Sequence, residues 1–200
     1  LIQLALLLIG RVPLFDSLCI TFGTAGTGGF GIVNDSLGSY STYCQVVTTI
    51  FMILFGVNFS AYYLILTKKF RQAFKYEEVR YYFGIIAVAI VIIALNTAHL
   101  FRNLLTAFQQ AAFQVGSIIT TTGFSSTDFN QWPALSKTVL VLLMFVGACA
   151  GSTGGGIKVS RILILCKAAK KEFQLYLHPN AVKKIKICLL YTSPSPRDCS

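Results

Sequence analysis

The chain has 200 residues, of which 54% are hydrophobic and only 12% are charged, and its mean hydropathy is +0.67. Soluble domains carry about 25% charged residues, so this composition argues against an ordinary soluble fold. The formal net charge of +10 could indicate a nucleic-acid partner, but the basic residues form two clusters that each follow a long apolar segment, which is the positive-inside pattern of membrane proteins. The first cluster is Lys68, Lys69, Arg71, Lys75 and Arg80, and the second is Lys158, Arg161, Lys167, Lys170, Lys171, Lys183, Lys184 and Lys186.

Three long stretches contain no charged residue, namely 36–67, 103–127 and 138–157. A membrane span needs about 20 mostly apolar residues, so these stretches are membrane candidates. We expect the two basic clusters on the cytoplasmic side, and the glycine-containing turns at 24–31 and 120–126 to open on the outside. The six cysteines form no Cys-x-x-Cys pair, and no nearby histidine supplies a zinc pattern, so we interpret them as small apolar filler in membrane helices.

In the first half of the chain, residues 1–10 read as the end of a span leading outward, and their start inside an apolar run predicts a chain cut at its beginning. Pro13 favours the first turn of a short helix over 13–22, followed by a non-helical, glycine-rich segment over 24–31. Residues 43–66 predict a span of about 24 residues that Gly56, Asn58 and Ser60 could break locally. A basic loop over 67–80 follows.

In the second half, residues 81–98 predict another span, and 104–120 a shorter helix that carries Gln109, Gln110 and Gln114. Amides are costly when they face lipid, so we expect this short helix to pack inside the protein. A non-helical turn over 120–126 comes next, and then a helix from Pro133 to Val146. A basic amphipathic helix is expected over 159–171.

Between these last two helices lies a segment, 147–158, with five glycines in its first ten residues. Each glycine costs about 1 kcal/mol relative to alanine inside a helix, so the segment cannot hold one. Irregular backbone at membrane depth is tolerated only against protein or a water-filled cavity. The sequence therefore predicts an intramembrane loop here.

A short signature occurs twice at a spacing of 94 residues, as Thr27-Gly28-Gly29-Phe30 and as Thr121-Thr122-Gly123-Phe124. Each copy follows a short helix and precedes a long apolar one. A helix, a re-entrant turn of small and hydroxyl residues and a second helix form an ion filter lined with backbone carbonyls. We expect the carbonyls of Thr27, Gly28, Gly29, Thr121, Thr122 and Gly123 to face a cation, with glycine supplying positive φ. Two such units running in the same direction would pack around an axis along the membrane normal, and a four-sided pore needs at least two more.

Two phosphate-binding interpretations compete with this one. Residues 26–31 fit G-x-G-x-x-G, but no acidic residue occurs between Asp35 and Glu77 to complete that fingerprint. Residues 151–158 resemble a Walker loop, but Ile157 separates the last glycine from Lys158. A membrane protein that binds a phosphate ligand through these glycine segments is therefore the lower alternative, and it predicts nucleotide binding by this chain itself.

Four segments together resemble the Trk/Ktr/HKT superfamily of potassium transporters, most closely the pore-forming membrane subunit of the Trk type. They are 26–30, 121–128, the glycine segment 147–158, and His178-Pro179-Asn180-Ala181-Val182. The resemblance implies an all-α membrane protein built from repeated helix–pore-loop–helix units of a potassium-channel-like pore, with a broken inner helix. It assigns residues 1–80 to the second unit, whose first helix is truncated, and 81–187 to the third. Residues 188–200 do not match and read as a non-native tail.

The same resemblance implies potassium uptake across the cytoplasmic (inner) membrane, with potassium as the substrate, no catalytic residue and no cofactor. Gly29 and Gly123 would be the filter glycines. The segment 147–158 would gate permeation, through Gly147, Gly151, Ser152, Thr153, Gly154, Gly155, Gly156 and Lys158. The implied partners are membrane lipid, a second copy in a homodimer and a cytosolic nucleotide-binding regulatory subunit. A sodium-permeable or sodium-coupled relative of the family stays open as the first alternative.

Overall fold

The computed structural model describes residues 1–68, 77–101 and 103–177, and within these ranges every regular element is helical. The elements are α1 (Ile2–Ile9), α2 (Leu14–Ala25), α3 (Thr42–Phe55), α4 (Phe59–Leu66), α6 (Glu77–Thr97), η1 (Ala98–Leu100), α7 (Leu104–Ile119), η2 (Phe129–Gln131), α8 (Ala134–Val146) and α9 (Val159–Leu177). The predicted non-native tail over 188–200 and the His178–Val182 motif lie outside the described residues.

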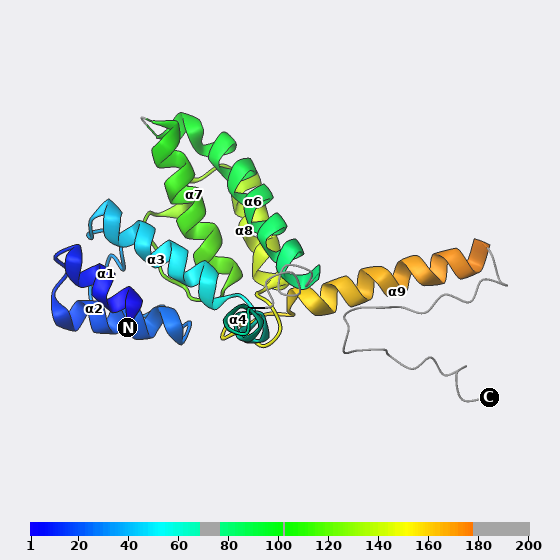
Figure 1. Cartoon of the computed structure of the whole chain (residues 1–200). Helices are drawn as coiled ribbons and strands as arrows, with labels where there is room; N and C mark the ends of the chain where they lie inside the picture. The colour runs from blue at the N-terminus through cyan, green and yellow to red at the C-terminus, as the bar shows by residue number, and fades with distance from the viewer. Residues whose placement is uncertain (69–76, 102, 178–200) are drawn as a thin grey trace.

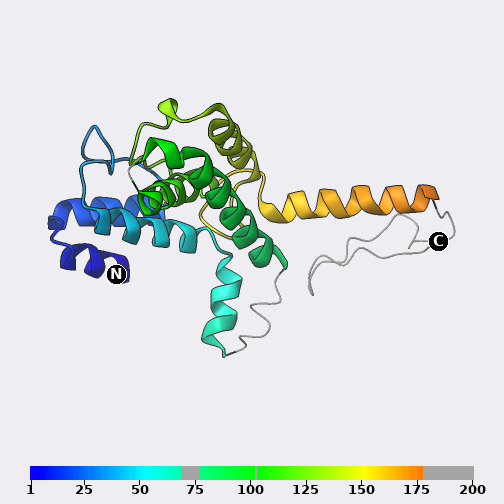
Figure 2. The same ribbon diagram turned by 90° about the horizontal axis from the view of Figure 1, so that it is seen from above.

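Most of the helices form two adjoining groups, from which α4 and α9 project (Figures 1 and 2). Helices α1, α2 and α3 pack on one another, as do α6, α7 and α8, and α3 also packs against α7 and so joins the groups. Helix α9 extends away from both (Figure 1). Each group contains one short helix that ends in a glycine-containing turn, α2 in the first and α7 in the second. This is the predicted arrangement, in which a short helix, a turn and a second helix follow one another, and it occurs in two copies.

Three predicted boundaries were wrong by a few residues. Thr24 was expected in the non-helical turn but lies in α2, where its hydroxyl donates to the Ile20 carbonyl at 2.6 Å and accepts from Gln3 Nε2 at 3.0 Å. The end of the basic loop, from Glu77 to Arg80, forms the first turn of α6, because the two glutamates there suit a helix N-terminus. Helix α9 continues beyond Lys171 to Leu177.

The long apolar segment 42–66 bends by 92° at its break, so it forms two helices and not one straight span. Helix α3 ends at Gly56, and Asn58 begins α4 by accepting a hydrogen bond from the Ser60 amide at 2.8 Å. The predicted local break is thereby confirmed. A second break follows α8 at Gly147, so both groups interrupt the helix that follows the turn.

The carbonyl groups that the break in α3 releases all have donors. Gly56 donates to Met52, the Tyr62 hydroxyl to Leu54 at 2.7 Å, and the Tyr82 hydroxyl to Ile53 at 3.1 Å. From the segment 147–158, the Thr153 hydroxyl reaches Phe55 O at 3.5 Å and the Cys149 amide reaches Gly56 O at 3.1 Å. Unpaired carbonyls at membrane depth would each cost several kcal/mol, so these donors are what allows the break to exist.

Removing one of these donors tests that account. The Tyr82→Phe variant keeps the buried ring but leaves Ile53 O without its side-chain donor, which costs about 1–3 kcal/mol for a buried acceptor. We expect a lower unfolding midpoint in detergent-solubilised protein. Tyr81→Phe is the matched control, because Tyr81 is 51% exposed on the same helix, and its midpoint should stay within error of the parent.

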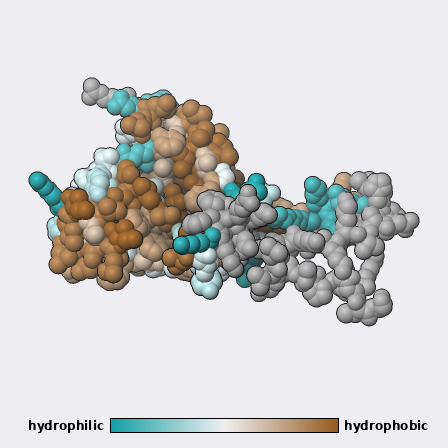
Figure 3. All heavy atoms as spheres, viewed as in Figure 1, coloured by the Kyte–Doolittle hydropathy of each residue, from teal (hydrophilic) through white to brown (hydrophobic). Residues whose placement is uncertain are grey.

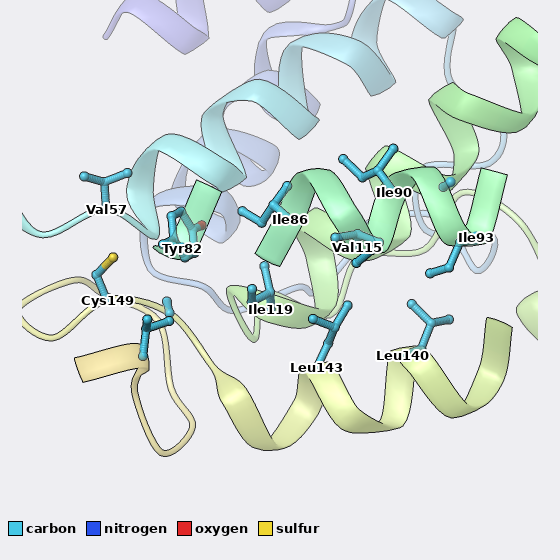
Figure 4. Packing of buried hydrophobic residues seen from close by; sticks show 14 of the residues in the cluster. Val57, Tyr82, Ile86, Ile90, Ile93, Val115, Ile119, Leu140, Leu143 and Cys149 are labelled. Atoms are coloured by element: carbon cyan, nitrogen blue, oxygen red, sulfur yellow. The ribbon is translucent and has the colours of Figure 1, made fainter. Parts of the chain in front are cut away.

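The larger core cluster lies between α6, α7 and α8, where Tyr82, Ile86, Ile90 and Ile93 face α7 and α8 (Figure 4). A second cluster joins the two groups and contains Leu7, Leu37, Met52, Phe113 and Phe124. Large apolar side chains also cover much of the outer surface, as the brown area of Figure 3 shows. The segment Glu77–Leu100 is long and apolar enough to cross a membrane, and the bent pair α3–α4 qualifies if it counts as one span.

Candidate functional site

The two signature turns have the same backbone conformation. Thr27 and Thr121 have φ of 51° and 58°, and Gly29 and Gly123 have φ of 67° and 90°. A threonine in the left-handed region costs about 1–2 kcal/mol, so its occurrence at matching positions is a built feature and not a chance turn. The expectation that glycine supplies positive φ in these turns is met at Gly29 and Gly123, whereas Gly28 does not need it.

The hydrogen bonds of the two turns also repeat at the 94-residue offset. The Gly28 amide donates to Gly23 O at 2.8 Å, and the Thr122 amide donates to Ser117 O at 2.9 Å. Each left-handed threonine turns its hydroxyl back onto the preceding carbonyl, at 2.8 Å for Thr27 and 2.6 Å for Thr121. The signature is therefore duplicated as a structure and not only as a string of residues.

The turns lie directly against one another. A Cβ atom built on Gly29 would stand 1.8 Å from the Thr122 carbonyl oxygen, so only glycine fits there. Around Gly123, by contrast, a Cβ would meet no atom of the described chain within 4 Å. Both turns follow helix C-termini, those of α2 and α7. The partial negative charge at a helix C-terminus favours a cation, whereas phosphate binds at an N-terminus.

A buried network of polar side chains is hydrogen-bonded to the residues that follow the second turn. Gln110 and Gln114 are buried, as expected, and the Gln114 amide donates to Thr127 O at 3.2 Å. Gln110 accepts from the Ser126 hydroxyl and donates to Gln45 Oε1 at 3.3 Å. Gln45 belongs to α3, so this network fixes the residues after Gly123 to both helix groups.

The segment 147–158 is irregular, as predicted, and folds back against the end of α8. A Cβ on Gly147 would lie 2.5 Å from Gly155 O, and Gly147 and Gly156 both have positive φ. The Ser152 hydroxyl donates to Cys149 O at 2.7 Å, and the Lys158 ammonium donates to Gly154 O. Gly151 and Lys158 complete the positive-φ residues of the loop, at 70° and 75°.

This loop touches both signature turns through their left-handed threonines. The Thr27 hydroxyl lies 3.1 Å from Thr153 O, and the Gly155 amide donates to Thr121 Oγ1 at 2.6 Å. Residues 153–155 are thus held against the two turns, over sequence separations of 126 and 34 residues.

Sequence reasoning identified the two turns and the loop but missed the side chains that hold them. Gln45 was not singled out, although an amide inside an apolar helix is itself a signal of internal packing. Glu78, which accepts a hydrogen bond from the loop, was counted only as part of a basic segment. Glu78 lies in the first turn of α6, and a carboxylate at that place in an apolar helix could have indicated a hydrogen-bond partner near the helix end.

The chain contains two units in which a short helix, a re-entrant turn and a broken inner helix follow one another. Such units define an all-α membrane protein of the pore-loop class. Within that class the chain belongs to the TrkH cation transport protein family, whose family model matches residues 6–189. This is a family of membrane transporters and not of enzymes, and it indicates no cofactor.

Individual relatives agree. The chain is 35% identical over 180 residues to the Trk system potassium uptake protein TrkH of Salmonella typhimurium, covering 88% of this chain and 37% of that protein. It is 31% identical over 182 residues to TrkG of Escherichia coli K12, covering 90% and 38%. The crystal structure of the potassium transporter TrkH from Vibrio parahaemolyticus aligns with a TM-score of 0.88 at 30% identity, covering 98% of this chain and 43% of that one. The chain therefore spans less than half the length of these relatives.

Proposed function

We propose that this chain forms the second and third pore units of a potassium uptake protein, in which ions pass in single file along backbone carbonyls. Residues 1–80 would be the second unit and 81–187 the third. The observation that carries the proposal is the duplicated turn, with the same hydrogen bonds and left-handed threonines at an offset of 94 residues. The relatives are potassium uptake proteins of the Trk system, and this supports potassium as the ion.

In this proposal the filter consists of Thr27, Gly28 and Gly29 from one turn and Thr121, Thr122 and Gly123 from the other. Carbonyl oxygens of such turns replace the hydration shell of a potassium ion. The contact between Gly29 and Thr122 supports an arrangement of the turns around one common axis. No covalent chemistry is needed, because the protein only has to offer oxygens and a path.

The segment 147–158 would be the gate. Its residues 153–155 bond to Thr27 and Thr121, so in the observed position it obstructs the way out of the filter. The basic residues in the sequence of α9 and of the segment before α6 support a cytoplasmic position for this exit, which in this proposal opens at the inner membrane. A second copy and a nucleotide-binding regulatory subunit are proposed as partners, following the family resemblance, and lipid would cover the exposed apolar faces of α6 and α8.

The test uses the complete four-unit protein in a bacterium that lacks its own potassium uptake systems. Growth at low external potassium and rubidium uptake are expected to be restored, and excess sodium should not compete. Gly123→Asp should abolish both, because a φ of 90° is strained for aspartate and the substitution puts a carboxylate beside the proposed filter. If excess sodium inhibits rubidium uptake, the result would favour the sodium-permeable alternative. Rescue unaffected by Gly123→Asp would contradict the filter assignment.

A further inference from the structure

One ionisable side chain from outside the loop holds the segment 147–158. Glu78 Oε1 accepts a hydrogen bond from the Ala150 amide at 2.6 Å, across 72 residues of sequence. Glu78 is half-buried in the first turn of α6, whereas Ala150 lies between the buried Cys149 and the positive-φ Gly151. The loop also bonds to backbone groups of the α3–α4 break, at Cys149, Gly151 and Thr153, and to the end of α8 through the Ile157 amide.

We propose that Glu78 is a positioning residue for transport: its carboxylate holds the segment 147–158 beneath the filter, in the position that obstructs the exit. This inference rests on the function proposed above. Backbone bonds hold the loop to the α3–α4 break, two further bonds hold it to the signature turns, and Glu78 ties it to α6. Without the carboxylate the Ala150 amide loses its acceptor, and the loop loses this hydrogen bond to α6.

The neighbouring Glu77 provides a contrast on the same helical turn. It pairs with Lys167 of α9, and the two side chains are 46% and 30% exposed. Exposed ion pairs contribute little because water and salt screen them. A carboxylate that accepts from a backbone amide in a less solvated place makes a charge-assisted bond about twice as strong as a neutral one. The loop should therefore depend on Glu78 and scarcely on Glu77.

The native Cys149 thiol supplies a direct readout of loop position, because it is buried next to Ala150. In the complete protein, with its other cysteines replaced by serine, we would compare Glu78→Ala, Glu78→Gln and the control Glu77→Gln. Labelling of Cys149 by a membrane-permeant maleimide and rubidium uptake per membrane-inserted molecule would be measured without the regulatory subunit. The Cys149→Ser protein gives the labelling background.

Glu78→Ala is expected to raise both the labelling rate and the uptake about tenfold. Glu78→Gln keeps an acceptor oxygen but no charge, so its labelling rate and uptake should lie between those of Glu78→Ala and the parent. Both quantities should stay within twofold of the parent in Glu77→Gln. Unchanged labelling in membrane-inserted Glu78→Ala, or an equal effect of Glu77→Gln, would overturn the proposal. If Glu78→Ala does not reach the membrane, Glu78→Gln decides, and unchanged labelling again overturns it. The labelling comparison stays valid even if the filter assignment fails, because it does not depend on ion flux.

Discussion

Gly29→Ala in the complete protein is expected to reduce rubidium uptake to the background of the host. The added Cβ would stand 1.8 Å from Thr122 O and 2.8 Å from its carbonyl carbon, both backbone atoms that cannot rotate away. The φ of 67° adds about 1–2 kcal/mol of strain for an L-residue. The two turns must therefore move apart. After such a shift their carbonyl oxygens can no longer replace the hydration shell of the ion.

The control for this experiment is the adjacent residue. A Cβ on Gly28 would have its nearest contact at 3.7 Å, with the Phe30 ring, and Gly28 has no positive φ. Gly28→Ala should therefore retain most of the uptake, measured on protein quantified in the membrane. If Gly29→Ala kept more than half of the parental rate, the close approach of the two turns would not matter for transport, and the proposed filter geometry would be wrong.

The second large effect is expected for Gly147→Ala, which should raise the uptake per folded molecule, whereas Gly29→Ala should abolish it. Its Cβ would lie 2.5 Å from Gly155 O and 2.9 Å from Gly156 Cα, and its φ of 69° with ψ of −169° is a region that only glycine occupies comfortably. Strain and overpacking together amount to about 2–5 kcal/mol, so less protein should fold. In the molecules that do fold, the loop should leave its place beneath Thr27 and Thr121, and uptake per folded molecule without the regulatory subunit should rise several-fold.

Gly84→Ala separates this effect from the general cost of changing a glycine. Gly84 lies inside α6, exposed, and a Cβ there would meet nothing within 4 Å. Alanine is favoured over glycine in a helix by about 0.5–1 kcal/mol, so this variant should be slightly more stable and should transport normally. Uptake by Gly147→Ala that stays at the parental level per folded molecule would argue against the loop as an obstruction.

The sequence predicted those parts of the fold that local chemistry dictates. Five glycines in ten residues exclude a helix wherever the segment lies, and the loop at 147–158 is indeed irregular. Amides at 109, 110 and 114 indicated a helix packed inside the protein, and α7 is that helix. The family was likewise evident from four short segments, and the family model confirms it.

Other features depend on contacts between distant segments, which no local pattern contains. The 92° bend after α3 was foreseen only as a local break, because its size depends on Tyr82 and Cys149 supplying hydrogen bonds from other elements. Thr24 was placed in the turn because the segment 24–31 is rich in glycine, yet a hydrogen bond from Gln3 helps keep it helical. The role of each residue in the filter and the gate stays a prediction until transport is measured.

The unequal surroundings of Gly29 and Gly123 have a consequence for how such a protein is made. The turn that contains Gly29 is closed by Thr122 of the unit that follows it in the chain, whereas the turn that contains Gly123 is open on the corresponding side. In a ring of such units each turn would be completed only by its successor. Translation would then leave every newly inserted unit unfinished until the next one enters the membrane, and the last turn would close only against the first.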